Sequence, residues 1–172
     1  MVLLNGAIGD HGITVMAERN GLSFSRGLVS DCAALNRMIG HVLEKNPQSI
    51  KFMRDPTRGG VASVLNEIVK GADFGITLFE RRLFIREEVR GVCEILGIDP
   101  LYAANEGKAL MIVRRADAEQ VVQAMRETPE GADARIIGEV TAEFPGKAQL
   151  ETAIGGRRIL PLLVEEQLPR IC

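Results

Sequence analysis

The last residue of the sequence is a cysteine, and its position suits a thiol that carries a chemical group. Cys172 follows Pro169, which fixes its own φ, lacks an amide donor and biases the preceding residue toward an extended conformation. Four extended residues span roughly 13 Å, so the thiol could enter a neighbouring pocket, be modified there and be withdrawn. The alternative is a frayed terminus whose cysteine has no role.

The stretch at residues 54–60 places a proline turn, a hydroxyl and two glycines between an apolar strand and an amphipathic helix. The free amides of a helix start suit phosphate, and glycines let the backbone approach a ligand closely. Arg58 could pair with phosphate oxygens, beside Thr57, Gly59 and Gly60. A capped turn without a ligand, with Asp55 or Thr57 as the N-cap, is the alternative.

Two other loops carry titratable side chains. Asp10 and His11 lie on a tight turn between glycines, where Asp10 could reach a magnesium ion through water and His11 a phosphate. An Asx-stabilised turn is the alternative. Glu106 comes just before an apolar strand and could serve as a general base with a pKa raised by burial. A surface loop glutamate is the alternative for Glu106.

Apolar spacing predicts an α+β or layered α/β domain with a mixed sheet and no internal repeat. We expect strands at residues 2–4, 50–53, 75–80, 109–113, 135–140, 148–153 and 158–160, and helices at 13–19, 31–45, 61–69, 86–96 and 117–127. Gly97 should stop the fourth helix, and Asp117 with Gln120 should form a capping box for the fifth. The glycines at 155–156 predict a hairpin. Cys32 and Cys93 fall on helical apolar stripes, so both are expected in the core.

Composition narrows the class of protein. The chain has 172 residues, which favours one domain with a largely aliphatic core, since it holds six Phe, one Tyr and no Trp. A formal charge of −2 provides no field for nucleic acid. No apolar run is long enough to cross a bilayer and no secretory signal precedes the domain, so we expect a cytoplasmic protein. Three cysteines without CxxC spacing argue against a disulfide framework or a zinc site, and with two histidines a metal cluster is not expected.

Taken together, these segments resemble the C-terminal half of the HypE family of hydrogenase maturation factors, within the AIR synthase (PurM-like) superfamily. The matching stretches are residues 9–12, 54–60, 105–108 and, above all, 161–172 with the ending Pro-Arg-Ile-Cys. The resemblance implies a layered α/β/α domain with a mixed sheet over residues 1–160 and an extended C-terminal tail over residues 161–172. It also implies that an N-terminal domain, which holds most of the magnesium and nucleotide ligands, is absent, so that this piece alone would be inactive.

The activity implied by this resemblance is an ATP-dependent carbamoyl dehydratase. HypF would place a carbamoyl group on Cys172, dehydration would yield a thiocyanate with Glu106 as the base, and the cyanide would pass to a HypC–HypD complex. The full-length protein would be a homodimer with ATP and magnesium as cofactors. The cofactor-binding residues carried over from the resemblance are Asp10, His11, Asp55, Thr57, Arg58, Gly59 and Gly60. The alternatives are a non-catalytic partner-binding domain, or another PurM-like enzyme that uses ATP on a small molecule.

Overall fold

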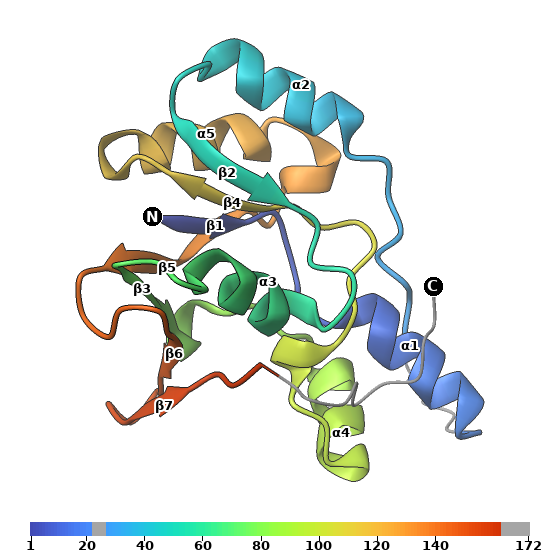
Figure 1. Ribbon diagram of the computed structural model, residues 1–172. Helices are drawn as coiled ribbons and strands as arrows, with labels where there is room; N and C mark the ends of the chain where they lie inside the picture. The colour runs from blue at the N-terminus through green and yellow to red at the C-terminus, as the bar shows by residue number, and fades with distance from the viewer. Residues whose placement is uncertain (22–26, 163–172) are drawn as a thin grey trace.

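The computed structural model describes residues 1–21 and 27–162, which form an α+β domain around one mixed sheet (Figure 1). The sheet order of the described strands is β2-β4-β1-β5-β3-β6-β7, and within it the pair β3–β6 is parallel while the other neighbours are antiparallel. The strands are β1 (Val2–Leu4), β2 (Ile50–Arg54), β3 (Gly75–Phe79), β4 (Leu110–Val113), β5 (Arg135–Thr141), β6 (Ala148–Glu151) and β7 (Arg157–Ile159). The predicted fold class is confirmed.

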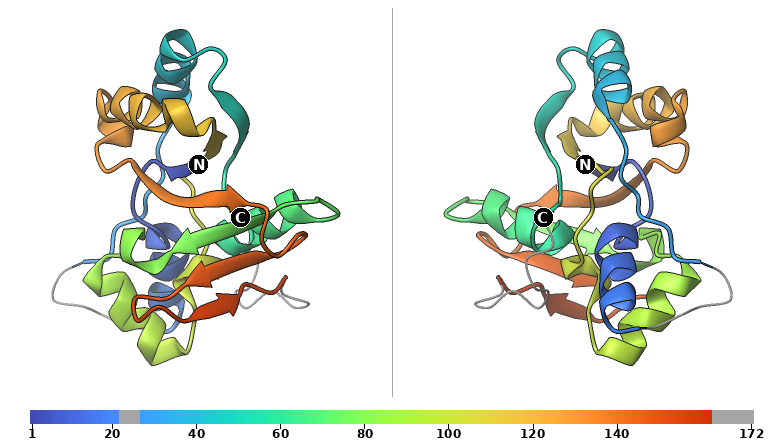
Figure 2. Two further views of the ribbon diagram at one scale, coloured as in Figure 1. Left: turned by 90° about the vertical axis from the view of Figure 1, so that its left-hand side faces the viewer. Right: turned by 90° about the vertical axis from the view of Figure 1, so that its right-hand side faces the viewer.

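Helices cover both faces of this sheet, as the views at right angles show (Figure 2). Helix α3 packs on one face, helices α2 and α5 pack on the other, and α1 packs against α4 beside them. The helices are α1 (Asp10–Arg19), α2 (Asn36–Lys45), α3 (Gly60–Val69), α4 (Glu87–Leu96) and α5 (Ala118–Arg126). This is the layered arrangement that the resemblance implied.

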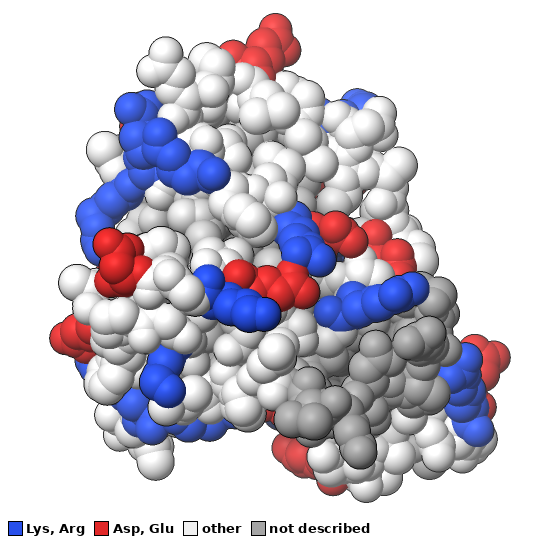
Figure 3. All heavy atoms as spheres, viewed as in Figure 1, with Lys and Arg blue, Asp and Glu red and all other residues white. Residues whose placement is uncertain are grey.

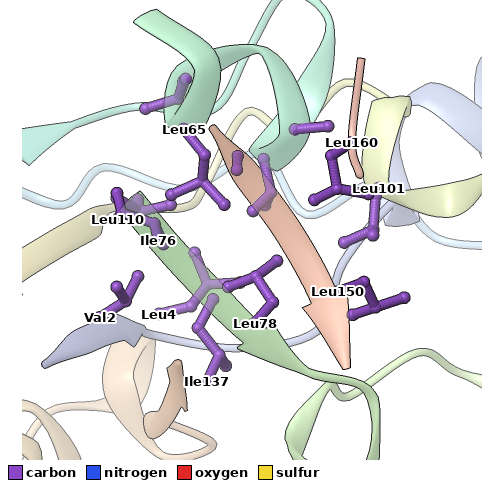
Figure 4. Close-up of a cluster of buried hydrophobic side chains, with 14 of the residues drawn as sticks. Val2, Leu4, Leu65, Ile76, Leu78, Leu101, Leu110, Ile137, Leu150 and Leu160 are labelled. Atoms are coloured by element: carbon purple, nitrogen blue, oxygen red, sulfur yellow. The ribbon is translucent and has the colours of Figure 1, made fainter. Parts of the chain in front are cut away.

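Alternate side chains of the central strands enter different cores. Val2 and Leu4 of β1 join the cluster under α3 (Figure 4). Leu3 joins the cluster under α2 and α5 instead. All three side chains are fully buried, because both faces of a central strand are covered. Each face of the sheet therefore has its own aliphatic core.

Several predicted boundaries are confirmed. Gly97 ends α4 with a left-handed backbone and donates its amide to the carbonyl of Cys93. Strands β6 and β7 form the predicted hairpin, with Gly155 at a φ of 86°. Cys93 is buried in the cluster between α1 and α4, as its position on the helical stripe predicted.

The start of the second helix was predicted wrongly, and with it the place of Cys32. Helix α2 begins at Asn36, five residues after Asp31, and residues 27–35 have no helix or strand. The carboxylate of Asp31 is bound by Lys108 and by the amide of Glu106, so it does not cap a helix. Cys32 is consequently exposed.

The capping box predicted for α5 is also wrong. Asp117 is the N-cap residue, but its side chain makes no capping hydrogen bond among the described residues. Its Oδ2 accepts instead from the hydroxyl of Ser49 at 2.8 Å and from Arg114 at 2.7 Å. Ser49 and Arg114, which lie outside the helix, thus bind the Asp117 carboxylate in place of the first-turn amides.

The charged surface is mixed on the face of Figure 3, where acidic and basic side chains lie next to one another across the middle of the view. Over residues 1–21 and 27–162, no helix is long and apolar enough to cross a membrane. Within the same ranges, no three side chains of His, Cys, Asp or Glu are grouped so that they could hold a metal ion. The tail expected at residues 161–172 lies outside the described residues beyond Leu162, and with it Cys172.

Candidate functional site

Three loops that the sequence analysis singled out separately meet at one place, which we call the loop junction: residues 9–12, 55–60 and 103–108. The segment 101–105 passes between the first turns of α1 and α3. On one side the amide of Gly12 donates to the carbonyl oxygen of Ala104 at 3.0 Å. On the other, a Cβ at Gly60 would lie 2.5 Å from the carbonyl oxygen of Leu101. Both helix starts therefore need a glycine where they touch this segment.

Asn105 binds all three loops with its side chain. It is fully buried, and its Oδ1 accepts from the amide of Gly9 at 2.8 Å. Its Nδ2 donates to the carbonyl oxygens of Pro56 at 3.0 Å and of Ala103 at 2.9 Å. Both hydrogens and the oxygen of the amide are used, so the group is satisfied although no solvent reaches it.

The start of α3 presents main-chain amides without a local competitor. Gly59 is its N-cap residue, with a φ of 66°, and within the described part of the chain no side chain caps the helix and no acidic residue lies in its first turn. The predicted alternative of an Asp55 or Thr57 cap is wrong, because the Thr57 hydroxyl donates to Asp55 Oδ2 at 2.5 Å instead. Arg58 is exposed next to this start. An anion is the ligand that such a terminus favours.

The start of α1 differs, because a carboxylate of its own lies there. Asp10 is in the first turn, with its side chain only 6% exposed and its Oδ2 3.1 Å from Nε of Arg86. Burial raises the pKa of Asp10 above its ordinary value, and the hydrogen bond and charge of Arg86 offset part of that rise. His11 Nδ1 lies 2.9 Å from the Ser30 hydroxyl and 3.6 Å from the Cys32 thiol. The magnesium and phosphate roles of Asp10 and His11 stay predictions.

Glu106 lies next to Asn105 on a rigidly held stretch of chain. Its amide donates to Asp31 Oδ1 at 3.2 Å, and Lys108 Nζ donates to Asp31 Oδ2 at 2.7 Å. The side chains of this ion pair are 9% and 3% exposed. At Gly107 a Cβ would lie 1.8 Å from the carbonyl oxygen of Asp31, so a larger residue does not fit. The backbone on both sides of Glu106 is thereby fixed.

A cavity of about 480 Å³ opens beside the junction. Its charged lining includes the pairs Asp10–Arg86 and Asp31–Lys108, both described above. Glu130 also lines it, and its Oε2 is a buried oxygen for which the described residues offer no hydrogen-bond partner. The two cations that line this cavity are thus each paired with a carboxylate, and Glu88 and Asp133 add further acidic side chains to the lining.

The structure brings together the three loops that carry the predicted site residues, through the hydrogen bonds of Asn105 with Gly9 and Pro56. The predicted residues on these loops are Asp10, His11, Asp55, Thr57, Arg58, Gly59, Gly60 and Glu106, and the cavity described above is lined by Asp10 but not by residues 55–60 or Glu106. Two residues that link them, Asn105 and Asp31, were not predicted in this role. A polar residue after two alanines and before a buried strand was a signal for Asn105, but its partners are 96 and 49 residues away.

Comparison with known proteins agrees with this geometry. Residues 1–151 match the family described as AIR synthase related protein, C-terminal domain. The carbamoyl dehydratase HypE of Rhodobacter capsulatus is 48% identical over 172 residues, which are 100% of this chain and 50% of that protein. The chain therefore spans about half the length of the curated relatives it matches.

Solved structures give the same result. A hydrogenase maturation protein HypE in complex with ATP superposes with a TM-score of 0.90 at 43% identity, covering 99% of this chain and 52% of that one. HypE in a HypE–HypF complex superposes with a TM-score of 0.88 at 42% identity, covering 95% of this chain and 52% of that one. The resemblance inferred from the motifs is confirmed.

Proposed function

Because the chain belongs to the family of AIR synthase related proteins, C-terminal domain, and resembles HypE over its whole length, we propose that it is the C-terminal half of an ATP-dependent carbamoyl dehydratase. The full-length protein would convert a carbamoyl group on Cys172 to a thiocyanate for the cyanide ligands of a nickel–iron hydrogenase. The observation that carries this proposal is the loop junction, where Asn105 joins the open start of α3 to the loop of Glu106.

The start of α3 fits the phosphates of ATP. Its first-turn amides have no side-chain cap and no carboxylate among the described residues, and two consecutive glycines, Gly59 and Gly60, have positive φ. Thr57 and Arg58 would add a hydroxyl and a cation to these amides. Asp55 is exposed and better placed than the buried Asp10 to meet magnesium, with the other ligands coming from an N-terminal domain.

When bound, ATP supplies the phosphoryl group that turns the carbamoyl oxygen into a leaving group. The carbamoyl nitrogen must then lose protons as the C≡N bond forms, and Glu106 would accept them. A base must be held at a fixed position to do this, and the contacts of Asp31 with the Glu106 amide and with Lys108 provide that support. Glu106 is thus the base in this proposal.

The partners follow from the same proposal. HypF would donate the carbamoyl group, and a HypC–HypD complex would accept the cyanide, because a thiol on a short C-terminal segment can visit more than one site. The full-length protein would act as a homodimer in the cytoplasm. A HypE–HypF complex among the similar structures supports the first of these partners.

The test is the mass of Cys172 in the full-length protein, treated with HypF, carbamoyl phosphate and ATP. We expect a carbamoyl adduct followed by the loss of one water, and neither change in Cys172→Ala. Glu106→Gln should accept the carbamoyl group and dehydrate it at least about tenfold more slowly. Peptide mapping is needed, because the thiol of Cys32 is exposed and could also react. An adduct on Cys32 or Cys93, or none, would overturn the carrier role, and normal dehydration by Glu106→Gln would remove the base assignment.

A further inference from the structure

We infer that Asn105 is a positioning residue, which sets the place of Glu106 relative to the phosphate-facing start of α3. The inference rests on the proposed function, since it concerns the same dehydration. Asn105 is the residue before Glu106, and through Pro56 it holds the loop that leads into Gly59 and Gly60. The Asn105 side chain thus fixes the positions of both the α3 start, which would hold the phosphates, and Glu106, which would take protons from the carbamoyl nitrogen.

The hydrogen-bond pattern at position 105 fits asparagine. One oxygen must accept from the amide of Gly9, and two hydrogens must reach the carbonyl oxygens of Pro56 and Ala103. Aspartate supplies the acceptor but no donor when ionised, and alanine supplies neither. Glutamine has the amide on a longer stem, which would displace one of the loops. A substitution at position 105 would leave some of these buried backbone groups without a hydrogen-bond partner. The free-energy cost of each unpaired group would favour a shift of the loops away from their present positions.

Backbone packing alone does not fix the two loops against each other. Gly60 lets the start of α3 approach segment 101–105 closely, but this steric contact only limits how close the two can come and does not hold them together. The bond from Asn105 Nδ2 to Pro56, at 3.0 Å, is an attachment across 49 residues that pulls the α3 loop toward Glu106. Losing it should let the loop shift, and misplacement of a reacting group by about 1 Å can slow a reaction about 100-fold.

The experiment compares Asn105→Ala, Asn105→Asp and a matched control in the full-length protein. The control is Gln149→Ala, which also removes a buried amide; Gln149 lies on β6 and donates to the Thr77 hydroxyl at 2.8 Å, away from the junction. For each variant, carbamoylation of Cys172, kcat and the KM for ATP are measured separately, with the melting temperature. We expect Asn105→Ala to accept the carbamoyl group and to lose about 100-fold in kcat, while the control stays within about threefold of the wild type.

The pH dependence of kcat for Asn105→Asp is a measurement that a merely structural role of Asn105 would not affect. An ionised carboxylate would face two carbonyl oxygens, whereas a protonated one can donate to one of them. The ratio of kcat for this variant to kcat for the wild type should therefore rise as the pH is lowered. Dividing by the wild type removes the titration of groups common to both proteins, and the measurement remains usable if Asn105→Ala does not fold.

The outcomes separate the two claims. A wild type that dehydrates the carbamoyl group while Asn105→Ala does so at an equal rate, or a pH-independent Asn105→Asp ratio, overturns the positioning role alone. A loss of kcat in Gln149→Ala as large as in Asn105→Ala does the same, because it would trace the loss to stability. If the wild-type protein accepts the carbamoyl group but that group never loses water, the proposed function is overturned, and the positioning role with it.

Discussion

The N-terminal ends of helices α1 and α3 have the same backbone arrangement but different charged surroundings. Each has a left-handed glycine as its N-cap residue, Gly9 and Gly59, and each packs its first turn on segment 101–105. Yet α1 has a carboxylate of its own in the first turn, and α3 has none. Two helix starts on one piece of backbone thus offer opposite environments to an incoming anion.

The difference teaches that a helix terminus becomes a candidate binding site only through its neighbours. At the α1 start the carboxylate of Asp10 already occupies the place that an anion would take, and Arg86 pairs with it. An incoming anion there would therefore meet a carboxylate. At the α3 start the exposed Arg58 adds positive charge to the helix dipole. The equivalent backbone gives a helix start with its own carboxylate at α1 and, at α3, an uncapped start for which we propose a phosphate ligand.

The largest expected effect tests whether the two starts are packed alike. Gly60→Ala would place a Cβ 2.5 Å from a carbonyl oxygen at a φ of 63°, and Gly12→Ala would place one 2.7 Å from the amide nitrogen of Ala104. Each should lower the free energy of unfolding by about 3 kcal/mol or more. Chemical denaturation of the chain measures this.

A matched control is Gly91→Ala in α4, where a Cβ meets nothing within 4 Å. It should raise the free energy of unfolding by up to about 1 kcal/mol, since alanine is the better helix former. If only one of the two junction variants were destabilised beyond this control, the two starts would not be packed alike.

A smaller effect tests the electrostatic difference in the full-length protein. Arg58→Ala should weaken ATP binding about tenfold, which is roughly 1.4 kcal/mol, because a cation next to the phosphates would be lost. Arg86→Ala should leave ATP affinity within about twofold, because Arg86 pairs with Asp10. Calorimetry gives both dissociation constants, and equal losses in the two variants would contradict the distinction between the helix starts.

The smallest effect concerns the pH dependence of stability. Burial raises the pKa of Asp10, so the folded protein holds that proton more tightly than the unfolded chain does. The contribution of Asp10 to the free energy of unfolding should therefore fall as the pH rises from the ordinary aspartate range, about 3.9, through the raised value. Asp10→Asn should remove this decline, and Arg86→Ala should steepen it because the offsetting cation is gone. Denaturation curves across this pH range would contradict the assignment if all three proteins showed the same slope.

Local signals in the sequence were enough for most of the framework. Gly97 stops α4 and the glycines before β7 make a hairpin because glycine itself permits the backbone that those turns require. Apolar spacing correctly placed α3 and α4 to within one residue, since each helix buries one stripe against a neighbouring layer. Boundaries and cores that depend on near neighbours in the chain could thus be predicted.

Contacts between distant residues account for the errors. Asp31 has the side chain of a helix cap, but Lys108, 77 residues away, binds its carboxylate, and Cys32 is then left outside the helix and exposed. Among the residues that the structure describes, the Asn105 side chain has no local partner besides the Ala103 carbonyl oxygen, so nothing nearby in the sequence marks it as the link between loops. The individual motifs of the candidate site were visible in the sequence, whereas the attachments between them required the fold.

The buried pair of Asp31 and Lys108 also constrains how this sequence can change over time. Replacing either partner alone leaves an uncompensated charge in the interior, at a penalty of about 3–5 kcal/mol, whereas replacing both with apolar residues avoids that penalty and leaves the Glu106 amide without its acceptor. Single steps between these two states therefore pass through a poorly folded intermediate. Among descendants of a common ancestor, we expect positions 31 and 108 to be either both retained or both substituted.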